Sequence, residues 1–240
     1  MIYTSKNKAD SALFNSLKAL AISNIIFVVS LLIPIGLSYT FESGIFDSGP
    51  NLKVDGNNVS TGIAKVIAGN ATGTAFLISK NQLLTCKHVV EEQNGQTVEL
   101  VFVKNGNTSK MGKVKFLSSN FDYALIELSE PVDDTYFLMT SESSESLQLN
   151  QEIAAIGFPD GIFASSIGSV SNTEYNGDNN LIQMWLGAWY GSSGSPVFNP
   201  QTKRVYGIIT SGKEGPNMVF ALKIEKIKED LAENKIPCDF

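Results

Sequence analysis

Short runs of apolar or alternating residues recur along most of the chain, and Gly, Asn, Asp and Ser separate one run from the next. Short apolar or alternating runs are typical of β-strands, whereas helices show longer runs in which apolar residues recur about every four positions. The series therefore predicts an all-β barrel or sandwich and not a sheet whose strands alternate with helices. The predicted strands lie at residues 63–69, 74–79, 82–86, 97–103, 113–118, 123–128, 152–158, 181–187, 195–198, 205–210 and 218–222.

Two segments interrupt the strand pattern. Residues 224–234, IEKIKEDLAEN, have the spacing of a short helix. Residues 133–150 form the most polar stretch within the series, and their SESSES core is expected to be a solvated connection because clustered like charge resists burial. This connection divides the folded region, residues 59–240, into β units at about residues 59–130 and 148–224.

The amino-terminal 40 residues have a different pattern. Residues 1–18 carry three lysines against one aspartate, and residues 19–37 contain no charged residue. A run of about 20 apolar residues spans the hydrocarbon core of a membrane, and the preceding lysines favour a cytoplasmic amino-terminus. We therefore expect a cytoplasmic leader at 1–18, a signal-anchor or signal peptide at 19–38 and a polar linker at 39–58.

Cleavage of the membrane segment stays open at this point. Gly36 and Ser38 have the small size and spacing of a signal-peptidase site, which would release a secreted protein. The long leader and the nearly full-length span favour a retained anchor, with the folded region outside the cytoplasm, in the periplasm or at the cell surface.

Composition narrows the classes of partner. The chain is 43% hydrophobic and 18% charged, which suits a globular protein with a substantial core. The net charge is −6, and no cluster of Lys and Arg forms a basic face, so a nucleic-acid partner is not expected. We expect no metal and no cofactor, and the oligomeric state stays open.

Three polar residues are candidates for chemistry, although each has an ordinary structural explanation. His88, in LLTCKHVV, is the single histidine of the chain, and a histidine beside apolar residues is more often a packed residue with one hydrogen bond. Asp122, in NFDYALIEL, has the position of a turn residue before a strand. Ser193 lies in GSSGSPVF, which is a turn by composition.

Together, the three segments have a specific order, His88 then Asp122 then Ser193, with the histidine in the first β unit and the serine in the second. The strings TCKHVV, DYALIEL and GSSGSPVF resemble those of trypsin-like serine peptidases, especially bacterial trypsin-like and HtrA-type protease domains. The resemblance extends from about Val59 to Asn234. It implies two packed six-stranded-type β-barrels with the site between them. The residue patterns described above add the short helix after the barrels and the membrane helix before them.

The resemblance also implies roles for these residues. Ser193 would be the nucleophile, His88 the general base and Asp122 the group that orients the histidine. The amides of Gly191 and Ser193 would form the oxyanion hole. Ser193 is favoured over Ser192 and Ser195 because it alone has Gly two positions before it and Gly immediately after it.

The function implied is that of a serine endopeptidase that cleaves a protein or peptide substrate through an acyl-enzyme. The alternative is a catalytically inactive domain that binds peptides or acts as a sensor while tethered to the membrane. Ser192 stands where digestive relatives have an Asp that pairs with a new amino-terminus, so no activation by cleavage is implied. With only Cys86 and Cys238, the core must form without a disulfide framework.

The resemblance further implies a pocket for the P1 residue, the substrate residue before the cleaved bond. None of its expected residues is acidic, which disfavours Arg or Lys, and no second histidine is present to select Glu. A small or medium apolar P1 residue is therefore expected. The expected lining consists of Gly187, Ala188, Trp189, Tyr190, Thr210, Ser211, Gly212 and residues near Met218.

Overall fold

A computed structural model describes residues 53–54, 57–104, 107–175, 177–213, 217–238 and 240. The membrane segment predicted at residues 19–38 lies outside these ranges, as does most of the linker predicted at 39–58. Within the described ranges, no helix has the length and apolar character needed to cross a membrane.

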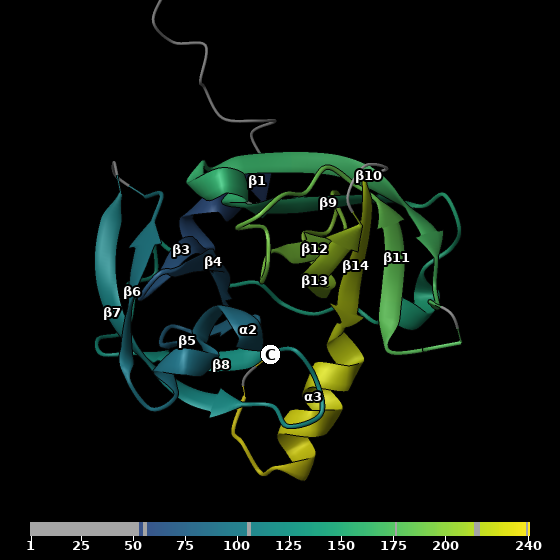
Figure 1. The fold of residues 1–240 in the computed structure, drawn as a ribbon. Coiled ribbons are helices and arrows are strands. Elements are labelled where there is room, and N and C mark those ends of the chain that lie inside the picture. Colours follow the sequence, from purple (N-terminus) through teal and green to yellow (C-terminus); the bar gives the residue numbers. More distant parts are fainter. Residues whose placement is uncertain (1–52, 55–56, 105–106, 176, 214–216, 239) are drawn as a thin grey trace, which may run out of the picture. The chain divides into compact units, whose positions relative to one another are not determined.

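The first half of the described chain forms a closed antiparallel barrel, coloured blue to teal in Figure 1. Its strand order is β3-β4-β5-β8-β7-β6, so β5 pairs with β8 and not with the next strand in sequence. A short helix, α2 (Lys87–Val90), and the 3₁₀ turn η2 (Glu91–Gln93) connect β5 to β6. The strands are β3 (Ile63–Ala68), β4 (Ala71–Leu77), β5 (Gln82–Thr85), β6 (Thr97–Phe102), β7 (Thr108–Leu117) and β8 (Ala124–Leu128).

The second half forms another closed antiparallel barrel, in the order β10-β11-β14-β13-β12-β9, and helix α3 (Ile224–Glu233) follows directly on β14 (Figure 1). The prediction of two six-stranded barrels with a carboxy-terminal helix is confirmed. The strands are β9 (Glu152–Gly157), β10 (Ala164–Asn172), β11 (Leu181–Trp185), β12 (Pro196–Phe198), β13 (Val205–Lys213) and β14 (Met218–Lys223). Outside the barrels lie β1 (Lys53–Val54), β2 (Asn57–Asn58) and the 3₁₀ turns η1 (Val59–Gly62), η3 (Ser144–Ser146) and η4 (Pro159–Gly161).

Strand β10 was not predicted from the sequence. Its residues, ASSIGSVSN, are small and polar, and most are only half-buried, so no apolar run marks the strand. The strand forms by pairing, because Ala164–Ser169 aligns residue by residue with β9 and closes the barrel. Tertiary context here overrides a weak local preference.

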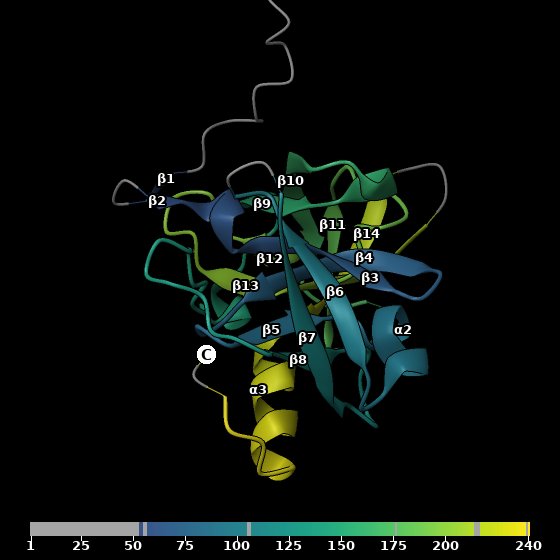
Figure 2. The same cartoon turned by 90° about the vertical axis from the view of Figure 1, so that its left-hand side faces the viewer.

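The core extends beyond either barrel alone. One apolar cluster fills the first barrel and continues through Phe198 and Ile208 of the second barrel to Ile227 and Leu231 of α3. A separate cluster, which includes Tyr206, lies inside the second barrel. Figure 2, in which the first barrel faces the viewer, shows α3 at the edge of β5, β7 and β8. The helix therefore packs against the first barrel as well as against β13 and β14 of the barrel that it follows in sequence.

The polar connection between the barrels differs in one respect from the expectation. Ser144, within the SESSES stretch expected to be solvated, is buried. Its amide and its hydroxyl both donate to the carboxylate of Glu225 at the start of α3. A carboxylate that accepts two hydrogen bonds compensates for burial of the serine, and sequence composition gives no sign of this partner.

We predict that Ile227→Ala destabilises the protein by about 2–5 kcal/mol, the usual cost of truncating a fully buried Ile. Ile227 has no exposed surface and belongs to the cluster that α3 shares with the first barrel. Denaturant unfolding measures the change. Glu233→Ala, on the exposed face of the same helix, is the matched control, and equal losses from the two variants would contradict the packing described.

Candidate active site

His88 lies on α2, the short helix that begins two residues after the end of β5. The helix is anchored on one face, because Val89 and Val90 are buried in the first barrel. Cys86, just before the helix, is also fully buried. With these residues facing inward, the His88 side chain is left 45% exposed at the surface of the barrel. The histidine is therefore a surface group on a rigid support and not a core residue.

Asp122 lies in the bend before β8 and contacts His88 at two points. One carboxylate oxygen accepts the ring Nδ1–H of His88 at 2.7 Å, and the other accepts the backbone amide of His88 at 3.0 Å. An ionised carboxylate can only accept, so Nδ1 carries the hydrogen and Nε2 is the ring nitrogen available for proton exchange. Residues 34 positions apart are thus joined in a fixed orientation.

The pair is electrostatically coupled. The hydrogen bond that His88 donates to Asp122 raises the pKa of His88; burial opposes this, and the negative charges of Asp122 and Glu91 add to the increase. Burial by itself would raise the pKa of Asp122, but the hydrogen bonds from the His88 ring and amide hold it below its usual value. The carboxylate therefore stays ionised beside the imidazole and stabilises its protonated form.

Ser193 lies in a tight loop between β11 and β12 that depends on two glycines. Gly191 and Gly194 both have φ near +90°, at 90° and 86°, in a region that side chains disfavour. A Cβ atom at Gly194 would overlap the Thr74 carbonyl oxygen, and one at Gly191 would overlap the carbonyl of Phe158. The glycines permit the loop to lie directly on neighbouring backbone.

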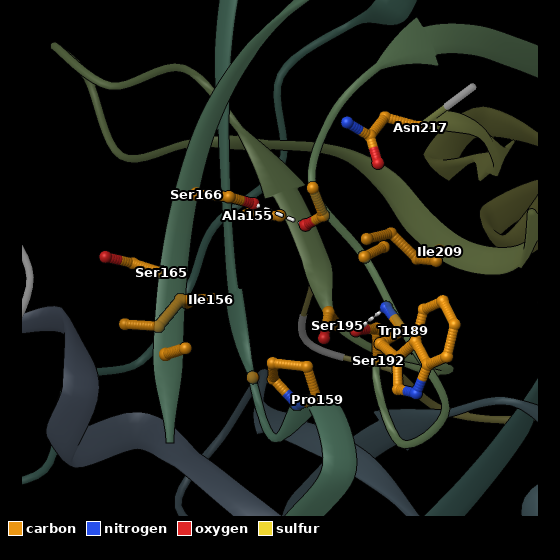
Figure 3. A pocket seen from close by; sticks show the side chains of 14 residues that line it. Ala155, Ile156, Pro159, Ser165, Ser166, Trp189, Ser192, Ser195, Ile209 and Asn217 are labelled. Atoms are coloured by element: carbon orange, nitrogen blue, oxygen red, sulfur yellow. Dashed lines mark hydrogen bonds between the residues drawn. The ribbon is translucent and has the colours of Figure 1, made fainter. Parts of the chain in front are cut away.

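The three serines of the loop have different surroundings. The Ser192 hydroxyl accepts a hydrogen bond from the backbone amide of Trp189 at 3.1 Å, which a dashed line marks in Figure 3. This hydroxyl therefore bonds within its own loop. Ser195 is buried, with its hydroxyl beside Gly157. The carbonyl of Ser193 accepts the amide of Thr74 at 2.8 Å, which ties this residue to the first barrel.

Further contacts hold the Ser193 loop beside the segment that carries His88. The Ile209 carbonyl accepts both the amide of Gly194, at 2.8 Å, and the thiol of Cys86, at 3.0 Å. The residue after Ser193 and the residue two before His88 therefore share one acceptor. Thr74 adds a side-chain hydrogen bond to the Gly191 carbonyl at 2.9 Å. His88, Asp122 and Ser193 are thus brought to the boundary between the barrels.

Two backbone N–H groups of the loop remain open. Across the described part of the chain, the amides of Gly191 and Ser193 have no hydrogen-bond acceptor. Their directions are nevertheless fixed, because the carbonyl of each peptide unit is held: Tyr190 O accepts the Asp160 amide at 2.6 Å, and Ser192 O accepts the Ser195 amide at 2.9 Å. The loop therefore presents two oriented donors on either side of Ser192, ready for a negatively charged oxygen.

A cavity of about 280 Å³ opens beside this loop (Figure 3). Its walls come from β9, β10, the segment before Ser193 and β13, and none of the described residues that line it is ionisable. Ser166 of β10 donates to the Gly187 carbonyl at 2.8 Å, which joins two residues of the lining. The lining consists of Ala155, Ile156, Gly157, Pro159, Ala164, Ser165, Ser166, Gly187, Ala188, Trp189, Ser192, Ser195, Ile209 and Asn217.

The expected and observed linings overlap only in part. Gly187, Ala188 and Trp189 line the cavity. Four expected residues, Tyr190, Thr210, Ser211 and Gly212, are not among the lining residues described, and Tyr190 is 73% exposed. Sequence reasoning also missed the β9 and β10 walls. The missed strand β10 contributes Ser165 and Ser166, and no sequence signal identified them because the strand itself has no apolar run.

Cys86, His88 and Asp122 also form a cluster of potential metal ligands, whose donor atoms lie within 4.8 Å of one another. The cluster fits a metal poorly. Burial, with the nearby charge of Asp122, raises the pKa of the Cys86 thiol well above its ordinary value, whereas a metal needs the thiolate. The thiol instead donates to Ile209, and the carboxylate is already bonded to His88.

Two closed β-barrels with a His–Asp pair on one and a glycine-bounded serine loop on the other are the architecture of a chymotrypsin-type serine hydrolase. A sequence profile described as "Trypsin-like peptidase domain" matches residues 73–208, more than half of the chain. The chain therefore belongs to the family of trypsin-like peptidase domains.

The chain is similar to two characterised proteases over about the same region. It is 24% identical over 188 residues to the human peroxisomal leader peptide-processing protease, covering 70% of this chain and 32% of that protein. It is 27% identical over 183 residues to the glutamyl endopeptidase of Staphylococcus epidermidis, covering 70% of this chain and 64% of that protein. The chain thus spans about a third of the first relative and just under two thirds of the second.

Solved structures show the same fold. The HtrA-type protease AlgW, in complex with a tripeptide, superposes with a TM-score of 0.64 at 18% identity, covering 74% of this chain and 61% of that one. The inactive form of a serine-to-alanine mutant of Rv3671c from Mycobacterium tuberculosis H37Rv gives a TM-score of 0.61 at 17% identity, covering 73% of this chain and 87% of that one.

We predict that Asp122→Asn lowers the pKa of His88, because the variant loses the charged acceptor that raises it while the opposing effect of burial remains. An NMR pH titration measures this without ambiguity, since the chain contains one histidine.

The same coupling affects stability. A raised pKa in the folded state stabilises the fold fully below the unfolded-state value of about 6.5, and this contribution is lost as pH rises through the folded-state pKa. Asp122→Asn should flatten this part of the pH dependence of unfolding. An unchanged His88 pKa in Asp122→Asn would contradict the coupling.

Proposed function

We propose that the protein is a serine endopeptidase in which Ser193 is the nucleophile, His88 the general base and Asp122 the group that orients the imidazole. The observation that carries the proposal is the pair of oriented, unpartnered amides at Gly191 and Ser193 within the described residues. An inactive peptide-binding domain would not need donors aimed at a developing oxyanion.

The mechanism follows from the bonding of His88. With Nδ1–H donated to Asp122, Nε2 takes the proton of the Ser193 hydroxyl as Oγ attacks the substrate carbonyl carbon. The imidazolium then passes that proton to the leaving amine, and an acyl-enzyme remains. A water molecule, deprotonated by the same nitrogen, attacks the acyl group, and the proton returns to Ser193 as the acid product leaves.

The negative charge in each tetrahedral intermediate develops on the former carbonyl oxygen. The amides of Gly191 and Ser193 supply two hydrogen bonds to this oxygen, each worth about 3 kcal/mol by the precedent of oxyanion-hole substitutions. Because neighbouring carbonyl contacts already hold both peptide units, little reorganisation is needed when the charge appears.

The loop needs no new amino-terminus for its conformation. Ser192 is held by the amide of Trp189, inside the loop, where an Asp paired with a freed amino group would depend on cleavage. We therefore propose that the protease domain is active as synthesised.

The cavity beside Ser193 is proposed as the P1 pocket. Ala155, Ala188 and Ile209 give it apolar walls, and the serines and Asn217 give it uncharged polar groups. A buried substrate charge would therefore have no counter-ion. The name of the staphylococcal relative refers to glutamate, but the described lining here offers no cation for that side chain. A small or medium apolar P1 residue suits the pocket better.

The cellular location is proposed from the sequence. Three lysines before the uncharged run at residues 19–37 support a membrane-anchored protein whose protease domain lies outside the cytoplasm. Cleavage near Ser38 would instead give a secreted enzyme.

We predict that Ser193→Ala reduces kcat/KM by a factor on the order of 10⁴ or more and abolishes labelling by a fluorophosphonate probe, with the fold retained. Ser195→Ala, two residues away, is the control and should still be labelled. Labelling of Ser193→Ala, or a wild-type protein inert to both probe and peptides, would contradict the proposal, and the second result would favour the peptide-binding alternative.

A panel of peptides that differ only at P1 tests the pocket. We expect Ala, Val and Leu to be cleaved with kcat/KM at least about 100-fold higher than Asp, Glu, Lys and Arg, because an unpaired charge in the pocket costs several kcal/mol. A preference for Glu or for Arg would contradict the pocket assignment.

A further inference from the structure

Asp230, on α3, is a buried carboxylate that takes no part in the mechanism described above. Its side chain is 1% exposed, and no basic group within the described residues forms an ion pair with it. Three neutral donors satisfy it instead. The hydroxyls of Tyr123 and Ser118 donate to Oδ2 at 2.7 and 2.8 Å, and the side-chain amide of Asn120 donates to Oδ1 at 2.8 Å.

All three donors belong to one short segment, residues 118–123, which we call the Asp122 loop because it carries that residue. Hydrogen bonds within the segment join its two ends. The backbone amide of Ser118 donates to the Tyr123 carbonyl, and the Ser118 hydroxyl accepts hydrogen bonds from the backbone amides of Asn120 and Phe121. Asp230 thus binds the first, third and last residues of the loop, with Asp122 beside the last of them.

The opposite side of the Asp122 loop contacts α2. The Lys87 ammonium donates to the Ser118 carbonyl at 2.9 Å, and Asp122 accepts two hydrogen bonds from His88. The loop therefore lies between α3, at the carboxy-terminal end of the fold, and the helix that carries the histidine. A shift of the loop relative to α2 would change the distance between the Asp122 carboxylate and the imidazole.

The charge state of Asp230 allows its carboxylate to accept all three hydrogen bonds. Burial raises the pKa of its carboxyl, but the hydrogen bonds from Tyr123, Ser118 and Asn120 outweigh burial and hold it below the usual value. Burial and the charge of Asp230 raise the pKa of the Tyr123 phenol, so Tyr123 stays a donor. A buried carboxylate without a cation adds little to stability over an apolar residue, whereas it specifies strongly which donors surround it.

We propose that Asp230 is a positioning residue, which fixes the conformation of the Asp122 loop and thereby the orientation in which Asp122 meets His88. Its kinetic consequence rests on the proposed function, whereas its effect on the histidine does not.

The test compares Asp230→Ala with Asp230→Asn. The Ala variant removes every acceptor, whereas the Asn variant keeps an oxygen for the two hydroxyls and an N–H that a rotated Asn120 amide can accept. We expect Asp230→Ala to lower the His88 pKa and to reduce kcat by about 10- to 100-fold with KM changed little, as for a displaced catalytic group. Asp230→Asn should restore most of both quantities.

The control is Glu225→Ala, which removes the other carboxylate anchor of the same helix, at Ser144, without touching the Asp122 loop. It should reduce the temperature of unfolding but leave the His88 pKa and kcat of the folded protein unchanged. If Asp230→Ala does not fold, Tyr123→Phe removes a single donor and should move both readouts in the same direction by a smaller amount.

NMR titration of the single histidine separates the outcomes. A lowered His88 pKa that Asp230→Asn restores supports the proposal, even if the wild-type protein hydrolyses no peptide, in which case only the proposed function fails. An unchanged His88 pKa in folded Asp230→Ala would overturn it, since Asp230 would then serve stability alone. An equal fall in the Asn and Ala variants would also overturn it, because the cause would be the lost charge and not the geometry.

Discussion

The close approach of Gly194 to the Thr74 carbonyl sets the arrangement of the whole site. No side chain fits at this point, so the loop of the second barrel lies directly on a strand of the first. The hydrogen bonds of Thr74 to Ser193 and Gly191, and the shared Ile209 carbonyl, then have only one geometry available. These contacts hold the loop that carries Ser193 beside the segment that carries His88. The interface is part of the site, and barrel packing and chemistry cannot be altered independently.

Hydrogen bonds of backbone groups hold the loop that carries Ser193 in position. The carbonyls of Tyr190 and Ser192 are bonded, and this leaves their partner N–H groups oriented but open. Unsatisfied donors normally cost stability, and proteins retain them where a ligand completes the bonding. At the first barrel, two carboxylates hold the Asp122 loop, one within the loop and one on α3. Asp122 faces the histidine, and Asp230 faces the interior, where neutral donors surround it. The Asp122 loop is hydrogen-bonded to α2 on one side and to α3 on the other, which limits the positions that Asp122 can take.

The cavity differs from the loop that carries Ser193, because it is lined by uncharged side chains of the second barrel, most of them small. Selectivity in such a pocket depends on shape and on the cost of burying charge, and each methylene contributes modestly. The exposed aromatic pair Trp189 and Tyr190, in edge-to-face contact with ring centroids 5.6 Å apart, lies at the same loop, with only Trp189 in the lining. Side chains therefore shape the cavity, whereas backbone contacts hold the loop that carries Ser193.

The amino-acid sequence by itself predicted most of the strands and the short final helix, because apolar runs are local signals. The two-barrel class and the candidates His88, Asp122 and Ser193 came from the resemblance of three ordered motifs to a known family. The sequence could not identify β10, whose small polar residues become a strand only by pairing with β9, and so it missed the wall that Ser165 and Ser166 form. Asp230 appeared only as one acidic residue of a helix; its role depends on three donors more than 100 positions away. Tertiary structure decided these features because burial and hydrogen-bond partners are properties of the folded chain, and residues distant in sequence supply them.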